Sequence, residues 1–307
     1  MTDPATSKAP ASLALDGAGC RLRGYDWGNP LGRPLVLVHG IEDFALGLEC
    51  LAEAFRGDYH VVAFDLRGHG DSDQPGAYTM GHFIADLHAV IAQLGLERPV
   101  LVGHSLGGQI VCQYAGVFPE VPRAAVNIDG MGPPMRIPEP DAEEKQLRTR
   151  EAVEGLLRGG APGRPIADLD DATQLYLRFH PKLDPGLARR LVEIGTAEHP
   201  HGGLRFKWDP RIHSLRLSST PEIAEERFRW AECPVLLVSA GEIDEFMWRR
   251  RGLDPSSLRK DPEEIRRRMA LFRDADHVEI PGAGHHVHFD APAALVSALR
   301  EFLKRIR

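Results

Sequence analysis

The amino-acid sequence predicts an α/β fold with a mostly parallel sheet and helices on both faces. Short apolar runs alternate along the chain with segments of helical pattern, and strands that alternate with helices are typical of a parallel sheet. The runs are 35–38, 61–64, 100–102, 124–128 and 235–238. Apart from Asn127, these runs are apolar at every position, which is typical of strands buried on both faces.

Helices are expected between these strands, near 46–55, 79–94 and 106–118. A final helix is predicted over 292–306, because its first residue is a proline, which suits the first turn of a helix. Residues 12–26 are predicted to form a hairpin ahead of the parallel strands, since two short runs flank a glycine-containing turn.

One long segment, residues 133–232, interrupts the alternation and is charged and proline-rich. It contains helical stretches near 141–158, 171–179 and 185–196, and a loop of this length without structure is improbable. We therefore expect a helical cap over the carboxyl edge of the sheet. The expected divisions are a flexible N-terminal tail (1–11), a core domain (12–132 and 233–307) and the cap (133–232).

Composition limits the kinds of partner. The net charge is −7 with both signs interspersed, so no nucleic-acid partner is expected, and the arginine runs 249–251 and 266–268 are interpreted as solvated faces. The cysteines are far apart and lack C-x-x-C spacing, which argues against disulfides and a zinc site. The first residues lack an apolar targeting segment and no run is long enough to span a bilayer, so we expect a cytoplasmic protein without a membrane partner. A homodimer remains open.

The strongest chemical signal is the G-x-S-x-G pattern centred on Ser105. An expected strand precedes it and an expected helix begins at Leu106. Such a turn projects the serine hydroxyl above the sheet edge, and it needs small residues two positions before and after the serine, where Gly103 and Gly107 stand. Ser105 is therefore the predicted nucleophile.

A serine hydroxyl needs a base, and the base needs an acid that orients it. His285 is the expected base, because it follows the last expected strand and precedes the final helix. On this kind of fold the acid lies between the serine and the histidine in the chain. Asp244 and Asp129 each follow a predicted strand there; Asp244 is the preferred acid and Asp129 the alternative.

The neighbours of His285 raise the question of a metal site. His286 and His288 could act as ligands, but no carboxylate stands at a suitable spacing, so no metal and no cofactor are expected. Backbone N–H groups of Ile41 and Leu106 are the predicted donors to an oxyanion. The segment 65–72 is interpreted as a structural turn.

These motifs together resemble the α/β-hydrolase superfamily in order and spacing. They are His39-Gly40, D-x-R-G-H-G-x-S at 65–72, the serine motif, Gly241-x-x-Asp244 and Gly284-His285. Residues 127–134 and 206–211 resemble the serine hydrolase-like subgroup. The resemblance implies an eight-stranded, mostly parallel sheet with a helical cap after the sixth strand, and no cofactor.

The function expected from these residues is hydrolysis of a carboxylic ester or related acyl compound, with a small-molecule substrate that carries an acyl or carbonyl group. A carbon–carbon bond hydrolase acting on a diketone, a perhydrolase, and a ligand receptor or pseudoenzyme are the alternatives, since the same triad occurs on this fold without fixing the substrate. Candidate substrate-pocket residues in the cap are Phe179, Phe206, Trp208 and Trp230.

Overall fold

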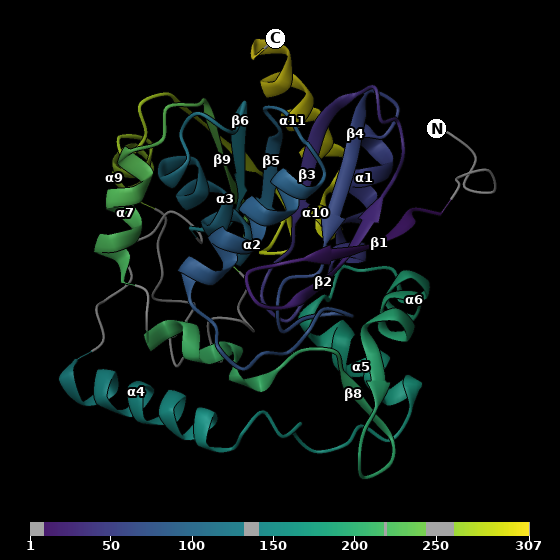
Figure 1. The fold of residues 1–307 in the computed structure, drawn as a ribbon. Coiled ribbons are helices and arrows are strands. Elements are labelled where there is room, and N and C mark those ends of the chain that lie inside the picture. Colours follow the sequence, from purple (N-terminus) through teal and green to yellow (C-terminus); the bar gives the residue numbers. More distant parts are fainter. Residues whose placement is uncertain (1–8, 132–140, 218–219, 244–260, 307) are drawn as a thin grey trace.

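A computed structural model describes residues 9–131, 141–217, 220–243 and 261–306 (Figure 1). Its centre is an eight-stranded sheet with the spatial order β1-β2-β4-β3-β5-β6-β9-β10. The strands are β1 (Ala11–Asp16), β2 (Arg21–Asp26), β3 (Arg33–Val38), β4 (Tyr59–Phe64), β5 (Val100–His104), β6 (Ala124–Ile128), β9 (Val235–Ala240) and β10 (Ala275–Ile280). Strand β2 pairs antiparallel with β1 and β4, and all other pairs are parallel. The predicted fold class is confirmed.

Helices cover both faces of this sheet (Figure 1). Outside the inserted segment they are η2 (Ala45–Leu48), α1 (Glu49–Phe55), α2 (Met80–Gln93), α3 (Leu106–Val117), α7 (Pro221–Arg229), α9 (Pro262–Met269), α10 (Val287–Asp290) and α11 (Pro292–Arg305). Side chains from α2, α3 and α7 pack on one face, and side chains from α1 and α11 on the other.

Strand β3 explains why the strand runs are apolar throughout. Successive side chains of a strand point to opposite faces. Val36 and Val38 accordingly belong to the core beside α2 and α3, whereas Leu35 and Leu37 belong to the core beside α1 and α11. All four residues are buried, so neither face of this strand tolerates a polar residue.

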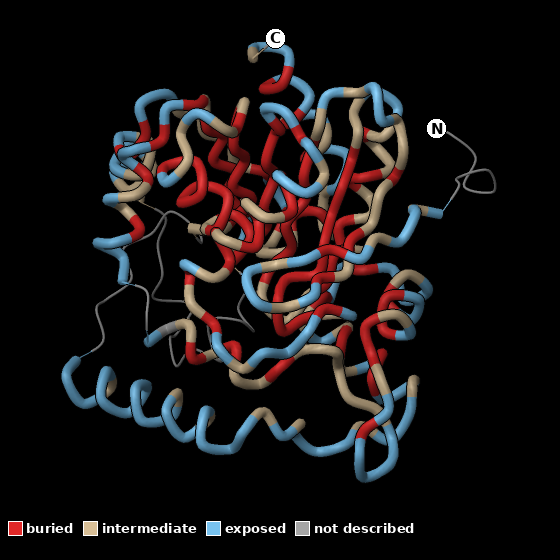
Figure 2. Tube along the Cα trace, in the orientation of Figure 1, coloured by how far each residue is buried: buried red, intermediate tan, exposed pale blue. Residues whose placement is uncertain are grey.

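The inserted segment lies along one edge of the sheet (Figure 1). Its elements are α4 (Ala142–Leu157), α5 (Leu169–Phe179), α6 (Pro185–Gly195), β7 (Thr196–Glu198), β8 (Leu204–Phe206) and η3 (Pro210–Leu217). The antiparallel pair β7–β8 was not predicted, because three-residue strands are too short to show a pattern. Helix α4 has no buried residue and runs along the outside of the molecule (Figure 2). We call the described residues 141–217 the cap.

Helix α7, which was expected within the cap (133–232), packs against the core. Phe228 of α7 is buried and stacks on Phe272, with ring centroids 5.2 Å apart. A Cβ atom on Gly116 of α3 would lie 1.8 Å from the carbonyl oxygen of Arg227, so this glycine lets the two helix backbones touch. Trp230 follows α7 and is half-exposed (50%).

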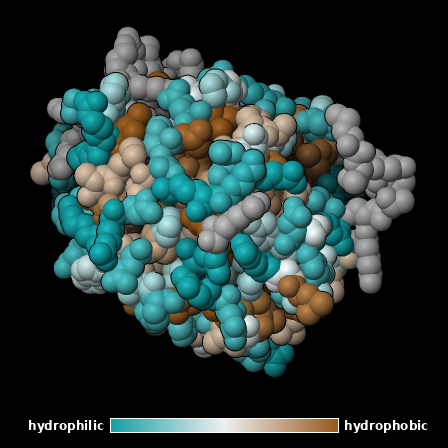
Figure 3. Space-filling model, turned by 90° about the horizontal axis from the view of Figure 1, so that it is seen from above, coloured by the Kyte–Doolittle hydropathy of each residue, from teal (hydrophilic) through white to brown (hydrophobic). Residues whose placement is uncertain are grey.

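Several other expectations can be compared with the described residues. All four cysteines are free thiols. The arginines 266–268 lie on α9 and pair with glutamates of the same helix. Arg266 and Arg267 are exposed, as expected of a solvated face, whereas the Arg268 side chain is only 12% exposed. Residues 249–251 lie outside the described residues. No described helix has both the length and the apolar composition needed to cross a membrane. On the side remote from the cap, hydrophilic residues surround small hydrophobic groups (Figure 3).

A buried ion pair connects the β1–β2 hairpin to α2. Arg67 Nε and Nη2 each lie 2.6 Å from a carboxylate oxygen of Asp86, and both side chains are buried. The same two side chains also bind the backbone of Ala18, which fixes the turn between β1 and β2.

Arg67→Met should lower the free energy of unfolding by about 3–5 kcal/mol, because Asp86 would remain as a buried charge without its partner. The matched control is Arg190→Met, which removes an ion pair with Glu49 at the surface and should cost about 1 kcal/mol or less. Urea unfolding monitored by circular dichroism measures both losses. Equal, small losses would show that the Arg67 pair does not hold the hairpin.

Candidate active site

Ser105 occupies a strained turn between β5 and α3. Its φ angle is 52° and its ψ angle is −115°, a conformation that residues other than glycine rarely adopt. The flanking glycines are required by close backbone approach. A Cβ on Gly103 would lie 2.1 Å from the carbonyl oxygen of Gly107, and a Cβ on Gly107 would lie 2.1 Å from that of Val38.

The hydroxyl of Ser105 lies within hydrogen-bond distance of an imidazole that itself contacts a carboxylate. Ser105 Oγ is 3.0 Å from His285 Nε2, and His285 Nδ1 is 2.7 Å from Asp129 Oδ2. Asp129 is buried, and its other oxygen accepts the N–H of Ala240 at 3.0 Å. A carboxylate only accepts, so His285 Nδ1 carries the proton and Nε2 is free to accept one from Ser105.

The contact that we expected from Asp244 is made instead by Asp129, the alternative acid. Strand β6 lies next to β5, and the N–H of Ser105 donates to the carbonyl of Ile128 at 2.9 Å. Asp129, the residue after Ile128, therefore lies beside the serine turn. Its φ of 50° turns the chain sharply after β6. Asp244 lies outside the described residues.

The segment after β3 approaches the serine turn at Gly40. A Cβ there would lie 3.2 Å from Ser105 Cβ. The N–H of Leu66 donates to His39 Nε2 at 2.9 Å, so Nδ1 bears the ring proton and donates to the carbonyl of Gly40 at 2.7 Å. In a trans peptide the C=O and the following N–H point in opposite directions. The N–H of Ile41 is therefore directed away from His39.

The segment 65–72 is a hydrogen-bonded turn, as interpreted from the sequence. Asp65 accepts the N–H groups of Ala45 at 2.7 Å and Asp71 at 2.9 Å, and its backbone carbonyl accepts the hydroxyl of Ser72. His69 is buried and its ring packs edge-on against His39. These contacts hold the loop after β3 in place.

Five histidines gather around the serine turn: His104, His180, His285, His286 and His288. Burial lowers the pKa of His180 and His288 to about 3, with neighbouring histidines adding to the effect. Burial also lowers the pKa of His104 and His286 well below the ordinary value. These four rings are therefore neutral at pH 7. Burial likewise raises the pKa of the nearby Asp43 carboxyl to about 7.

A hollow lies between the cap and the loop after β3. Its lining includes two of the predicted pocket residues, Phe206 and Trp208, together with Phe44 and Tyr176. Within the described part of the chain, Phe179 and Trp230 do not line it. The pocket candidate Trp230 follows α7, outside the cap, and its side chain is half-exposed.

Polar contacts attach the cap to the core, two of them through residues that line this hollow, Glu42 and Lys207. His213 Nε2 lies 2.9 Å from Glu42, and Lys207 Nζ lies 2.8 Å from Asp71. The hydroxyl of Tyr78 donates to Asp209 at 2.5 Å. Lys182 Nζ of the cap donates to the carbonyl of Gly282, in the loop that carries His285, at 2.6 Å. The ring of His180 packs on His286 with centroids 4.1 Å apart, so the cap lies directly against the loop that carries His285.

This sheet, with a serine, a histidine and an aspartate joined at its carboxyl edge, defines an α/β hydrolase. Residues 35–298 match the alpha/beta hydrolase family, and the chain belongs to that family. Serine hydrolase-like protein 2 of Homo sapiens is 28% identical over 290 residues, which are 91% of this chain and 89% of that protein. The 3-hydroxybutyrate-oligomer hydrolase of Cupriavidus necator is 27% identical over 92% of each chain.

Solved structures give the same fold. The thioesterase domain from the curacin biosynthetic pathway has a TM-score of 0.77 at 25% identity and covers 96% of this chain and 100% of its own. E-2-(acetamidomethylene)succinate hydrolase has a TM-score of 0.75 at 22% identity, covering 96% of this chain and 99% of its own. Family membership and these relatives identify the chain as a hydrolase.

Gly103→Ala should destabilise the protein by about 3 kcal/mol, because its methyl group would overlap backbone atoms that cannot move without breaking the serine turn. Gly57→Ala is the control: the space around Gly57 is open, so the change should be nearly neutral. Chemical denaturation of both variants checks this. A Gly103→Ala variant as stable as Gly57→Ala would contradict the close approach.

Proposed function

We propose that this hydrolase cleaves carboxylic esters through an acyl-enzyme on Ser105. The observation that carries the proposal is the chain of two contacts, Ser105 Oγ to His285 Nε2 at 3.0 Å and His285 Nδ1 to Asp129 at 2.7 Å. In this reaction His285 takes the serine proton as the hydroxyl attacks the ester carbonyl. Asp129 holds the imidazole in the required tautomer and stabilises the imidazolium.

The imidazolium then protonates the leaving alcohol, and the acyl group remains on the serine. Water attacks that acyl group with His285 again as base, which releases the acid and restores the hydroxyl. Two backbone donors support the proposal. Leu106 is the first residue of α3, so its N–H has no partner within the helix, and the N–H of Ile41 is directed away from His39. Both would donate to the oxyanion.

The hollow beneath the cap supports an apolar acyl group as the part of the substrate that is recognised. Phe44, Tyr176, Phe206 and Trp208 supply aromatic surface, while Lys207 and Glu42 supply polar groups at the same hollow. The names of two relatives, an oligomer hydrolase and a thioesterase, denote acyl substrates as well. The four free thiols fit a reducing compartment, and we propose a cytoplasmic location.

Ser105→Ala should lower turnover of short p-nitrophenyl esters by about 10³-fold or more, because Ser105 is the nucleophile that the described residues place at His285 Nε2. A fluorophosphonate probe should label the unmodified protein once and the Ser105→Ala protein not at all. A panel of esters and diketones completes the test. Cleavage of diketones in preference to esters would favour a carbon–carbon bond hydrolase, and binding without multiple turnover would indicate a receptor.

Asp129→Asn should lower turnover by about 10⁴-fold in a folded protein, because an amide supports the wrong imidazole tautomer. Asp244→Asn is the matched comparison, with the same isosteric change at the other candidate acid, and should leave turnover within a few-fold of the unmodified protein. Steady-state kinetics on one ester measures both. If Asp244→Asn were the more damaging change, the acid in this mechanism would have to be reassigned.

A further inference from the structure

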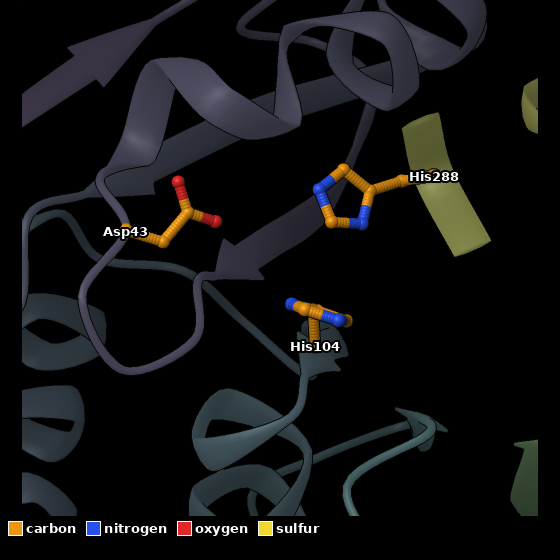
Figure 4. Close-up of side chains that lie close together, drawn as sticks. All are labelled: Asp43, His104 and His288. Carbon is orange, nitrogen blue, oxygen red and sulfur yellow. The ribbon is translucent and has the colours of Figure 1, made fainter. Parts of the chain in front are cut away.

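We propose that Asp43, His104 and His288 bind a divalent transition-metal ion of the Zn²⁺ type behind the Ser105–His285 pair. One ligand atom from each residue lies within 4.8 Å of the other two. The three side chains come from the loop after β3, the end of β5 and α10, and they face a common space (Figure 4). No metal is expected from the sequence, because the histidines next to His285 have no carboxylate at a suitable spacing in the chain; Asp43 is distant in sequence.

The atoms that meet at this point are buried without hydrogen-bond partners. Among the described residues, none is paired with Asp43 Oδ2, His104 Nδ1 or either ring nitrogen of His288. Leaving one buried polar group unsatisfied costs about 1–3 kcal/mol, and here several such atoms face one another. A cation at their centre would satisfy one atom from each residue at once.

The second nitrogen of His104 has the contact typical of a metal-bound histidine. His104 Nε2 lies 2.9 Å from the carbonyl oxygen of His285, and since a carbonyl only accepts, Nε2 carries the proton. Nδ1 is then unprotonated, and its lone pair is available to a metal ion in the cluster. Histidine ligands usually donate their other ring N–H to a carbonyl or carboxylate, which fixes the tautomer that binds the metal.

Asp43 is held so that one oxygen remains available. Its Oδ1 accepts the N–H of Phe44 at 2.8 Å, which leaves Oδ2 for the cluster. A Cβ on Gly47 would lie 2.5 Å from Oδ1, so the glycine makes the space in which the carboxylate sits. Asp43 also lines the hollow beneath the cap, which is the side from which an ion would enter.

The ligand set selects the class of ion. Two imidazole nitrogens and one carboxylate oxygen suit Zn²⁺ and neighbouring divalent transition metals, whereas Ca²⁺ and Mg²⁺ prefer oxygen ligands alone. Zn²⁺ bonds of about 2.0–2.2 Å place tetrahedral ligand atoms about 3.3 Å apart, so atoms now within 4.8 Å would draw in by about 1.5 Å at most. Small side-chain rotations cover that distance.

Such an ion would cross-link three segments on which the proposed chemistry depends. Asp43 stands two residues after Ile41, His104 directly precedes Ser105, and His288 follows His285 by three residues. The ion would therefore hold together the loop that carries Ile41, the turn at Ser105 and the loop that carries His285. The proposal does not require that the ion touch the substrate.

Tag-free, full-length protein stripped with a chelator should bind one Zn²⁺ per chain in a calorimetric titration. Co²⁺ should bind in competition with Zn²⁺ and give a visible spectrum of nitrogen and oxygen ligands without a thiolate charge-transfer band. The unfolding temperature should rise with Zn²⁺. Absence of stoichiometric binding by the unmodified chain would overturn the proposal, and this measurement needs no variant.

Asp43→Asn and His288→Gln should each weaken Zn²⁺ binding by at least ~10–100-fold. That is the loss typical when a residue that only supports a metal ligand is changed, and here the ligand itself is changed. His180→Gln is the matched control, because it changes a buried histidine of the same group that is not one of the three ligands, and it should bind as the unmodified chain does. Equal binding by all variants would place the ion elsewhere and overturn the assignment. Ser105→Ala should keep full binding, so this test stands apart from that of the proposed hydrolysis.

Discussion

The close backbone approach at the Ser105 turn is the constraint on which the rest of the site depends. Because Gly103 and Gly107 carry no side chain, the start of α3 lies against β5 and against the carbonyl of Val38 at the end of β3. The loop after β3 passes so near the serine that a Cβ on Gly40 would lie 3.2 Å from Ser105 Cβ. One steric requirement therefore brings the nucleophile, the neighbouring loop and the helix start together, before any hydrogen bond to His285 is considered.

The features that the sequence predicts well are those encoded within a few consecutive residues. Strand β3 is apolar at alternate positions on both faces, so its burial follows from a run of four residues. The serine turn is similarly local, since its glycines, its strand and its helix are contiguous in the chain. The position of His285 follows from the strand before it and the helix after it, and the structure places it at hydrogen-bond distance from Ser105.

The features that the sequence does not decide depend on neighbours that are distant in the chain. Asp129 and Asp244 both follow parallel strands, and the contact with His285 comes to Asp129 through the order of strands and the turn that its positive φ allows. Helix α7 carries apolar residues that would suit a cap or a core. Gly116 of α3 lets α7 pack against the core. Asp43 meets His104 and His288 only because three separate segments end at one edge of the sheet.

The five histidines around the serine raise the question of which ring can hold a proton. Transfer of an imidazolium out of water is unfavourable unless a negative charge compensates it. His180 and His288 are buried and His286 is half-buried, all among other rings, and their pKa values are lowered accordingly. Among the described histidines of the group, His285 alone is paired with a carboxylate, that of Asp129, and it alone has a ring nitrogen at hydrogen-bond distance from the Ser105 hydroxyl. The proton that leaves the serine therefore has one acceptor in this group, His285, and Asp129 fixes the geometry of that acceptor.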